Sequence, residues 1–351
     1  MPSLFDPIQL GDLYLPNRIF MAPLTRLRGT PDHIPTPIMV DYYTQRAGAG
    51  LIISEGTPID PLGVGYANVP GLWSQQQTEA WKPITAAVHN AGGHIYSQIW
   101  HVGRISDPEF LNGQLPVAPS AIAATGTVSL LRPQRPYPTP RALKIEEIKG
   151  IVEAFRRGAQ NAMSAGFDGV ELHGANGYLL DQFLQDGSNH RTDEYGGPIE
   201  NRARLMLECA DAAISVFGPG RVGMHLAPRP DAHGISDSNP TATFTYIAHE
   251  LGKRKIAFIA AREHPGPDSI GPNLKQAFGG VFVANEAIDF QTGQQLLDEG
   301  KADAVAFGKL FIANPDLPAR FAKGSPLNRP NAATFYAPGP EGYTDYPALQ
   351  S

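Results

Sequence analysis

Three residues with complementary chemistry lie close together near the middle of the chain. His173, Asn176 and Tyr178 are three and then two positions apart, and they follow a short, mostly apolar run that ends at Leu172. An imidazole and a carboxamide can both hydrogen-bond an oxygen atom. A phenol has an ordinary pKa of about 10, so it is protonated at neutral pH and can donate its proton. Together the three side chains could hold an oxygen atom and protonate a neighbouring atom.

The scaffold that must position these residues alternates short apolar runs with helical patterns. Strands are predicted at about 18–22, 51–54, 94–99, 168–172, 221–226, 257–260, 280–284 and 303–307, and each is nearly all apolar. Helices are predicted at about 36–47, 77–91, 145–164, 200–216, 241–252, 271–278, 291–299 and 315–322. Such strands are typical of parallel sheets that are buried on both faces. The alternation predicts an α/β fold, a single (β/α)8 TIM barrel formed by residues 1–351.

An open doubly wound sheet is the alternative architecture. It normally has a glycine-rich turn after its first strand, and Pro23-Leu24-Thr25-Arg26 is not such a turn. Residues 5–15 predict a hairpin that turns at Gly11-Asp12 and caps the barrel floor. The stretch at about 103–143 is rich in Pro, Ser and Gly and predicts a long excursion after strand three. The aromatic tail at about 326–351 is expected to pack on the barrel.

Composition narrows the classes of partner. A net charge of -6 without a basic cluster disfavours nucleic acid, and the apolar runs are too short to span a membrane. The first residues lack the pattern of a signal peptide, so the cytoplasm is the expected location. Cys209 is the single cysteine, which excludes internal disulfides and Cys-ligated clusters, and no His, Asp or Glu spacing indicates a metal site. The sequence leaves open whether the protein forms a homo-oligomer.

Active sites of such barrels lie at the carboxyl ends of the strands. The residues expected there are Pro23, Leu24, Thr25, Gly56, Gln98, Trp100, His173, Asn176, His225, Asn285, Gly308 and Lys309. This set suits a flat, partly polar ligand that carries a phosphate. Backbone amides after strand eight, together with the Lys309 cation, would form the phosphate cradle.

Six ordered segments carry the pattern of one family. They are Asn17–Arg26, Ser97–Arg104, His173–Leu184, Asn189–Gly197, Gly308–Leu317 and Gly342–Pro347. With them the chain resembles, over nearly its whole length, the old yellow enzyme family of flavin-dependent ene-reductases. It is similar to the branch of that family with Thr, not Cys, after strand one, at Thr25. The resemblance implies tightly bound FMN and a reductant that is NADPH or NADH.

The resemblance also implies a role for each residue of the site. The residues that would bind FMN are Pro23, Leu24, Thr25, Gly56, Gln98, His225, Asn285, Gly308 and Lys309. His173 and Asn176 would hold the oxygen of an α,β-unsaturated carbonyl or nitro compound, and Tyr178 would protonate its carbon after hydride transfer. The residues that would line the substrate slot with them are Tyr66, Trp100 and Tyr336. The implied substrates are small electron-poor alkenes.

Two positions depart from the family pattern. His225 stands where the family usually has an arginine at the end of strand five, and Arg262 is a candidate for a substitute cation. Asn285-Glu286 stands where a glycine-rich phosphate turn is common, so Glu286 would have to point away from a phosphate.

Two other functions remain open on the sequence. One is a flavin-binding reservoir or sensor without turnover. The other is a flavin-free barrel lyase or isomerase, which would need an essential lysine or carboxylate at a strand end. Glu171 is expected to point into its strand, and Lys309 is already explained by a phosphate, so this second alternative ranks low.

Overall fold

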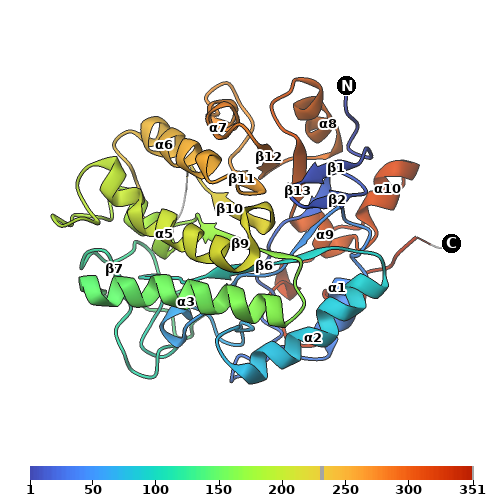
Figure 1. Ribbon diagram of the computed structural model, residues 1–351. Coiled ribbons are helices and arrows are strands. Elements are labelled where there is room, and N and C mark those ends of the chain that lie inside the picture. The colour runs from blue at the N-terminus through green and yellow to red at the C-terminus, as the bar shows by residue number, and fades with distance from the viewer. Residues whose placement is uncertain (230–232, 350–351) are drawn as a thin grey trace.

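The computed structural model describes residues 1–229 and 233–349, and in Figure 1 helices surround a central group of strands. The parallel strands of the barrel are β3 Ile19–Met21, β4 Ile52–Ile53, β6 Ile95–Trp100, β9 Gly169–Gly174, β10 Val222–Leu226, β11 Phe258–Arg262, β12 Val281–Asn285 and β13 Ala304–Phe307. Pairing of β13 with β3 and of β4 with β6 closes the ring. The predicted TIM barrel is confirmed, with strand ends within about two residues of those expected.

The helices on the outside follow the expected order. Those that match predicted segments are α1 Ile38–Thr44, α2 Gln75–Asn90, α3 Ile145–Ser164, α5 Ile199–Phe217, α6 Pro240–Lys253, α7 Gly271–Phe278, α8 Phe290–Asp298 and α10 Leu317–Lys323. Helix α3 buries a stripe that includes Ile148, Ile151 and Phe155, as the spacing predicts. Two short helices, α4 Leu179–Leu184 and α9 Lys309–Ala313, were not expected. Each is too short to display a helical repeat in the sequence.

The N-terminal hairpin fills one end of the barrel. Strands β1 Ile8–Leu10 and β2 Leu13–Leu15 pair antiparallel, as predicted. The backbone N–H of Asp12 donates to the carbonyl oxygen of Gly220, 3.0 Å away and just before β10 begins. Leucines of both hairpin strands pack with Phe20 and Phe258 in one buried cluster. The hairpin therefore closes the amino ends of the strands, which leaves the carboxyl ends for a ligand.

The predicted excursion after the third barrel strand covers part of the opposite end. It contains two short parallel strands, β7 Val117–Ala118 and β8 Arg141–Ala142, and β5 Thr57–Pro58 pairs with the end of β6 nearby. Its side chains Leu111, Val128, Leu131 and Tyr137 are buried in one cluster with Tyr66, Trp100 and Tyr178. The excursion therefore covers the aromatic side chains of Tyr66, Trp100 and Tyr178 at the carboxyl ends of the strands.

The described part of the C-terminal tail, residues 326–349, is held by buried arginines; residues 350–351 of the predicted tail lie outside the described chain. Arg26 donates from Nε to the carbonyl oxygen of Phe335 and from Nη2 to that of Gly342, at 3.0 and 2.7 Å. Tyr42 of α1 stacks on Tyr343 of the tail with ring centroids 4.0 Å apart. These contacts fix the tail beside the first two strand ends of the barrel.

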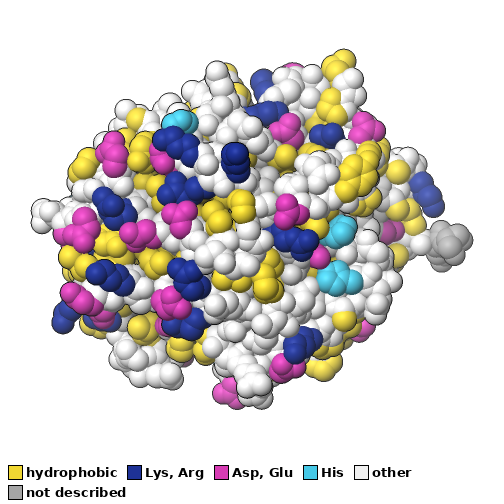
Figure 2. All heavy atoms as spheres, in the orientation of Figure 1, with side chains coloured by type: hydrophobic (Ala, Val, Ile, Leu, Met, Phe, Trp, Pro, Cys, Tyr) yellow, Lys and Arg dark blue, Asp and Glu magenta, His cyan; other side chains and the backbone are white. Residues whose placement is uncertain are grey.

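The surface carries both signs of charge. In Figure 2, Lys and Arg side chains intermingle with Asp and Glu over the visible face, in keeping with a modest net charge of -6. Within residues 1–229 and 233–349, none of the helices has the length and hydropathy needed to cross a bilayer.

Candidate active site

A cavity of about 630 Å³ lies at the carboxyl ends of the strands. That size is within the usual range for ligand and cofactor pockets. The expected site residues that line it are Pro23, Leu24, Thr25, Gln98, Trp100, His173, Asn176, Tyr178, His225, Asn285, Gly308 and Lys309. These residues come from six barrel strands or the loops that follow them, so the closed barrel brings together side chains that are far apart in sequence.

Three expected site residues lie outside the lining of this cavity. Tyr66 reaches the site indirectly, because its hydroxyl lies 2.9 Å from that of Tyr178. Gly56 packs behind Trp100, where a Cβ atom would stand 2.7 Å from the indole ring. Tyr336 is 48% exposed in the tail. The roles predicted for these three residues in binding FMN or substrate stay predictions.

An aromatic cluster surrounds the candidate proton donor. Trp100 stacks on Tyr66 and on His173, with centroids 5.9 and 5.6 Å apart. The ring of Tyr178 meets both Trp100 and His173 edge-on, at 4.8 Å in each case. Asn176 and Gly177 both adopt positive φ, +58° and +76°, which turns the chain sharply after β9 and into α4. This turn is what brings the phenol of Tyr178 back beside the imidazole of His173.

Burial sets the protonation of these groups. It raises the pKa of Tyr178 well above its ordinary value, and the neighbouring Tyr66 phenol raises it further. It lowers the pKa of His173 well below its ordinary value, and electrostatic interactions with the neighbouring His225 and Arg262 act in the same direction. At neutral pH the phenol therefore keeps its proton and the imidazole of His173 is uncharged.

Glu171 is a member of the site that the sequence interpretation missed. Its Oε2 accepts a hydrogen bond from Gln98 Nε2 at 2.8 Å, and its Oε1 lies 3.4 Å from Nδ1 of His225. The residue is 1% exposed, and a buried carboxylate of this kind requires donors or a cation beside it. A signal was available: Glu171 is the single charged residue of β9. In register, Gln98 faces Glu171 and His173 faces His225, so all four side chains reach one interior surface.

The lining of this cavity fits a flat ligand with polar edges and a phosphate. Trp100 Nε1 and His173 Nδ1 are buried and have no hydrogen-bond partner among the described residues. Buried polar atoms are nearly always paired, so these two nitrogens suggest that a ligand completes the site. Lys309 and Arg262 line the same cavity and supply positive charge for an anion.

The loop after β12 keeps the shape of a glycine turn without glycine. Glu286 and Ala287 have φ of +96° and +52°, in the region that glycine adopts most easily. The carboxylate of Glu286 is bound to Arg262, with 2.7 Å between Oε2 and Nε. The side chain of Asn285 donates to the carbonyl oxygen of Ala306 at 2.7 Å, so this amide retains one further N–H for a phosphate.

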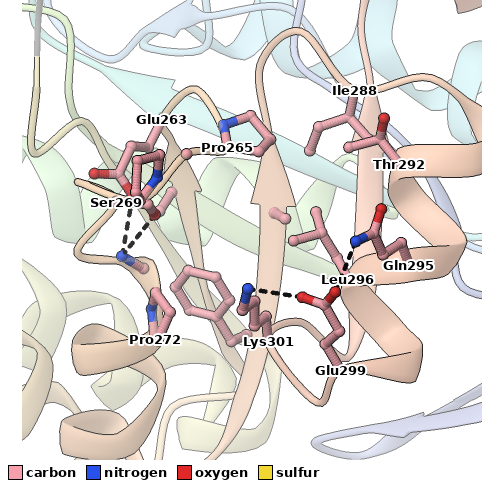
Figure 3. A pocket seen from close by; sticks show the side chains of 16 residues that line it. Glu263, Pro265, Ser269, Pro272, Ile288, Thr292, Gln295, Leu296, Glu299 and Lys301 are labelled. Carbon is pink, nitrogen blue, oxygen red and sulfur yellow. Dashed lines mark hydrogen bonds and ion pairs between the residues drawn. The ribbon is translucent and has the colours of Figure 1, made fainter.

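A second cavity, of about 430 Å³, lies on the outer side of β11 and β12, between α7 and α8 (Figure 3). Its carboxylates are already engaged. Glu263 accepts from Ser269 and from backbone N–H groups at the start of α7, and Glu299 pairs with Lys301 and Gln295. Through the described ranges, no group of three or more His, Cys, Asp or Glu residues is arranged to hold a metal ion. The cavity at the strand ends is therefore the candidate active site.

Comparison with known proteins identifies relatives over the full length of the chain. The 12-oxophytodienoate reductase 1 of Oryza sativa subsp. japonica is 44% identical over 361 residues, which cover 99% of this chain and 93% of that protein. A probable flavin mononucleotide-dependent alkene reductase of Leishmania infantum is 42% identical, with 99% and 97% covered.

Solved structures agree with these relatives. The old yellow enzyme homologue from Zymomonas mobilis superposes with a TM-score of 0.96 at 46% identity, covering 99% of this chain and 100% of that one. Morphinone reductase in complex with tetrahydroNAD gives a TM-score of 0.96 at 49% identity, with 100% and 98% covered.

The sequence pattern of the NADH:flavin oxidoreductase / NADH oxidase family matches residues 3–328. This match confirms the predicted enzyme class, an oxidoreductase that pairs FMN with a nicotinamide reductant. The narrower assignment to the branch with Thr25 stays a prediction. The chain belongs to the NADH:flavin oxidoreductase / NADH oxidase family, the old yellow enzyme family that its motifs resemble.

Proposed function

We propose that the protein is an FMN-dependent ene-reductase that uses NAD(P)H to reduce the C=C bond of α,β-unsaturated carbonyl or nitro compounds. One observation carries the proposal: a neutral phenol, Tyr178, stands against a neutral imidazole, His173, in a cavity whose other walls match the expected FMN residues. The relative from Leishmania infantum, named as an alkene reductase, supports the same class of substrate.

The chemistry that FMN supplies in such a site is acceptance of a hydride from the nicotinamide and its donation to the activated carbon. The protein's part is to bind and tune the cofactor. Thr25, Gln98 and His225 would contact the polar edges of its ring system, and Lys309 would neutralise its phosphate. Glu171 sits between Gln98 and His225 and so orients both groups toward the cavity.

His173 and Asn176 would hold the substrate's oxygen. Reduction at the β carbon places negative charge on that oxygen, and hydrogen-bond donors fixed in advance stabilise the charge as it develops. Because His173 is uncharged, it offers a single N–H and does not protonate the oxygen outright.

Tyr178 would deliver the proton to the α carbon. The reaction then balances: the β carbon gains a hydride from NAD(P)H, the α carbon gains a proton from the phenol, and Tyr178 is reprotonated from solvent. Tyr66 lies within hydrogen-bond distance, so its hydroxyl can stabilise the phenolate that Tyr178 becomes.

We expect the purified protein to bind FMN and to gain stability from it. A ligand that binds only the folded state at one hundred times its Kd stabilises the protein by about 2.7 kcal/mol. Unfolding in guanidinium chloride with and without FMN measures this gain, and riboflavin, which lacks the phosphate, is the matched control. A protein that takes up neither flavin, or that is equally stable with and without FMN, would contradict the proposal.

Turnover separates an ene-reductase from a flavin reservoir or sensor. Under anaerobic conditions, NADPH should bleach the bound flavin, and cyclohexenone should then restore its colour much faster than it oxidises free reduced FMN. A flavin reservoir without turnover would also be bleached by NADPH, but cyclohexenone would restore its colour no faster than it oxidises free reduced FMN. Saturated cyclohexanone is the control, because it has the carbonyl oxygen but no alkene to reduce.

Replacing His173 and Asn176 together with Ala should weaken the binding of a phenol, whose oxygen mimics the anionic oxygen of the reaction. Each lost hydrogen bond to a charged group is worth about 1.5–3 kcal/mol, so the loss in affinity is expected to be at least tenfold. Calorimetric titration of the FMN-loaded protein with para-chlorophenol checks this. Parent affinity in the double variant would argue against the oxygen-holding role.

A further inference from the structure

Arg262 connects two loops at the mouth of the cavity. It is the last residue of β11, and its Nη1 donates to Oδ1 of Asn176 at 3.0 Å. Its Nε donates to Oε2 of Glu286 at 2.7 Å. Asn176 follows β9 and Glu286 follows β12, and all three residues line the same cavity. A single guanidinium therefore ties the substrate-side loop to the loop after β12.

The contact determines which way the amide of Asn176 faces. An amide's oxygen and nitrogen differ little in shape, and the side chain can turn over at small cost. Arginine has no acceptor, so the atom that faces Arg262 must be the oxygen. The Nδ2 group of Asn176 is then left as the part of the amide that can reach a ligand, and it can only donate.

The charge of Arg262 strengthens this arrangement. A carbonyl oxygen that accepts from a cation polarises its amide, which makes the N–H groups better donors. The same charge contributes to lowering the pKa of His173, so both groups that would hold the substrate oxygen are neutral donors. Reversal of the Asn176 amide would instead point a carbonyl oxygen at an anionic oxygen, which is repulsive.

Glu286 holds Arg262 from the other side. Its backbone has a φ of +96°, an unfavourable conformation for a residue with a side chain. From that position its carboxylate reaches the guanidinium of Arg262, and both side chains are less than a third exposed. A glycine would adopt this turn conformation more easily, but it would have no side chain. Glu286 adopts the same conformation and anchors Arg262 with its carboxylate.

We infer that Arg262 is a positioning residue that presents the N–H of Asn176 to the substrate oxygen, with Glu286 as its anchor. The inference rests on the proposed function, because it refines how the oxygen is held. It predicts that the effect of Arg262 on the affinity for a phenol passes mainly through Asn176.

A double-mutant cycle tests this inference on the FMN-loaded protein. The variants are Arg262→Met, Asn176→Ala and the two combined, and the readout is the Kd of para-chlorophenol by calorimetry. We expect each single change to weaken binding about tenfold, and the combined variant to bind no more weakly than Asn176→Ala alone. Glu286→Gln should weaken binding in the same direction but less, and it serves as the second test should Arg262→Met fail to fold. Arg254→Met, which removes a guanidinium that pairs with Asp211 and Glu250 away from the cavity, should leave the Kd unchanged.

The outcomes distinguish failure of the role inferred for Arg262 from failure of the oxygen-holding role in the proposed function. Unchanged affinity in both Arg262→Met and Glu286→Gln would overturn the inference alone, as would equal effects of Arg262→Met with and without Asn176. Unchanged affinity in Asn176→Ala would overturn the oxygen-holding role as well as the inference. In each variant the flavin spectrum reports whether FMN is still bound.

Discussion

Replacing Tyr178 with Phe is expected to slow the reoxidation of the reduced enzyme by cyclohexenone by about 10²- to 10⁴-fold. Reduction of the enzyme by NADPH should stay near the parent rate, because that step needs no proton from the phenol. The expectation follows from the position of Tyr178 in the cavity and from burial, which raises its pKa and keeps it protonated at neutral pH. Stopped-flow absorbance of the two half-reactions, measured separately, checks the prediction.

Two neighbouring tyrosines provide the controls for Tyr178→Phe. Tyr66→Phe removes the hydroxyl 2.9 Å away and should cause a smaller loss, since the proton donor itself remains. Tyr137→Phe changes a phenol of the excursion that packs in the same cluster, and both rates should stay at parent values. If Tyr178→Phe and Tyr137→Phe behave alike, the assignment of Tyr178 as the acid is wrong.

Replacing Arg26 with Met is expected to destabilise the protein by about 3–5 kcal/mol. Arg26 is fully buried, and its guanidinium donates to Tyr42 and to the tail carbonyl oxygens of Phe335 and Gly342. It also lies near Glu55, a buried carboxylate that accepts from the backbone N–H of Arg26. The substitution leaves carbonyl oxygens unpaired and removes the positive charge that partly offsets Glu55. Guanidinium chloride unfolding of the FMN-free protein measures the free energy of unfolding.

The control for this stability prediction is Lys82→Ala. Lys82 forms an exposed ion pair with Glu79 on α2, and such pairs contribute about 0–1 kcal/mol. Because Arg26 directly follows Thr25 of the cavity lining, its loss should also lower FMN retention, whereas Lys82→Ala should not. A cost for Arg26→Met as small as that for Lys82→Ala would contradict the account of the tail.

The barrel could be predicted from the sequence because its pattern is local. Each strand is a short apolar run between helical repeats, and the eight units follow one another along the chain. Helices α4 and α9 could not be predicted in this way. They lack a repeat, and they form where the loop after β9 or β13 is held against the barrel by tertiary contacts, such as Leu179 N–H to the carbonyl oxygen of His101.

The cavity lining could be predicted in the same way, since parallel strands deliver their carboxyl ends to one face. Contacts between individual side chains could not be predicted from the sequence. Glu171 was dismissed as a strand residue, whereas strand register places it beside Gln98 and His225. The link from Arg262 to Asn176 and Glu286 joins the end of β11 to two loops, and no spacing in the sequence encodes it. His225 stands where the family usually has an arginine, and Arg262, the substitute cation considered from the sequence, lines the same cavity; its role toward a cofactor stays a prediction.

The positions of isotope labels in the product test the central claim most directly. With cyclohexenone, deuterium at C4 of NADPH should appear at the β carbon of the product, and solvent deuterium should appear at the α carbon. The two additions should occur on opposite faces of the former double bond, since we propose that the hydride and the proton of Tyr178 would reach the substrate from opposite sides. Label from NADPH at the α carbon, solvent deuterium at the β carbon, or turnover that persists without FMN would contradict this account.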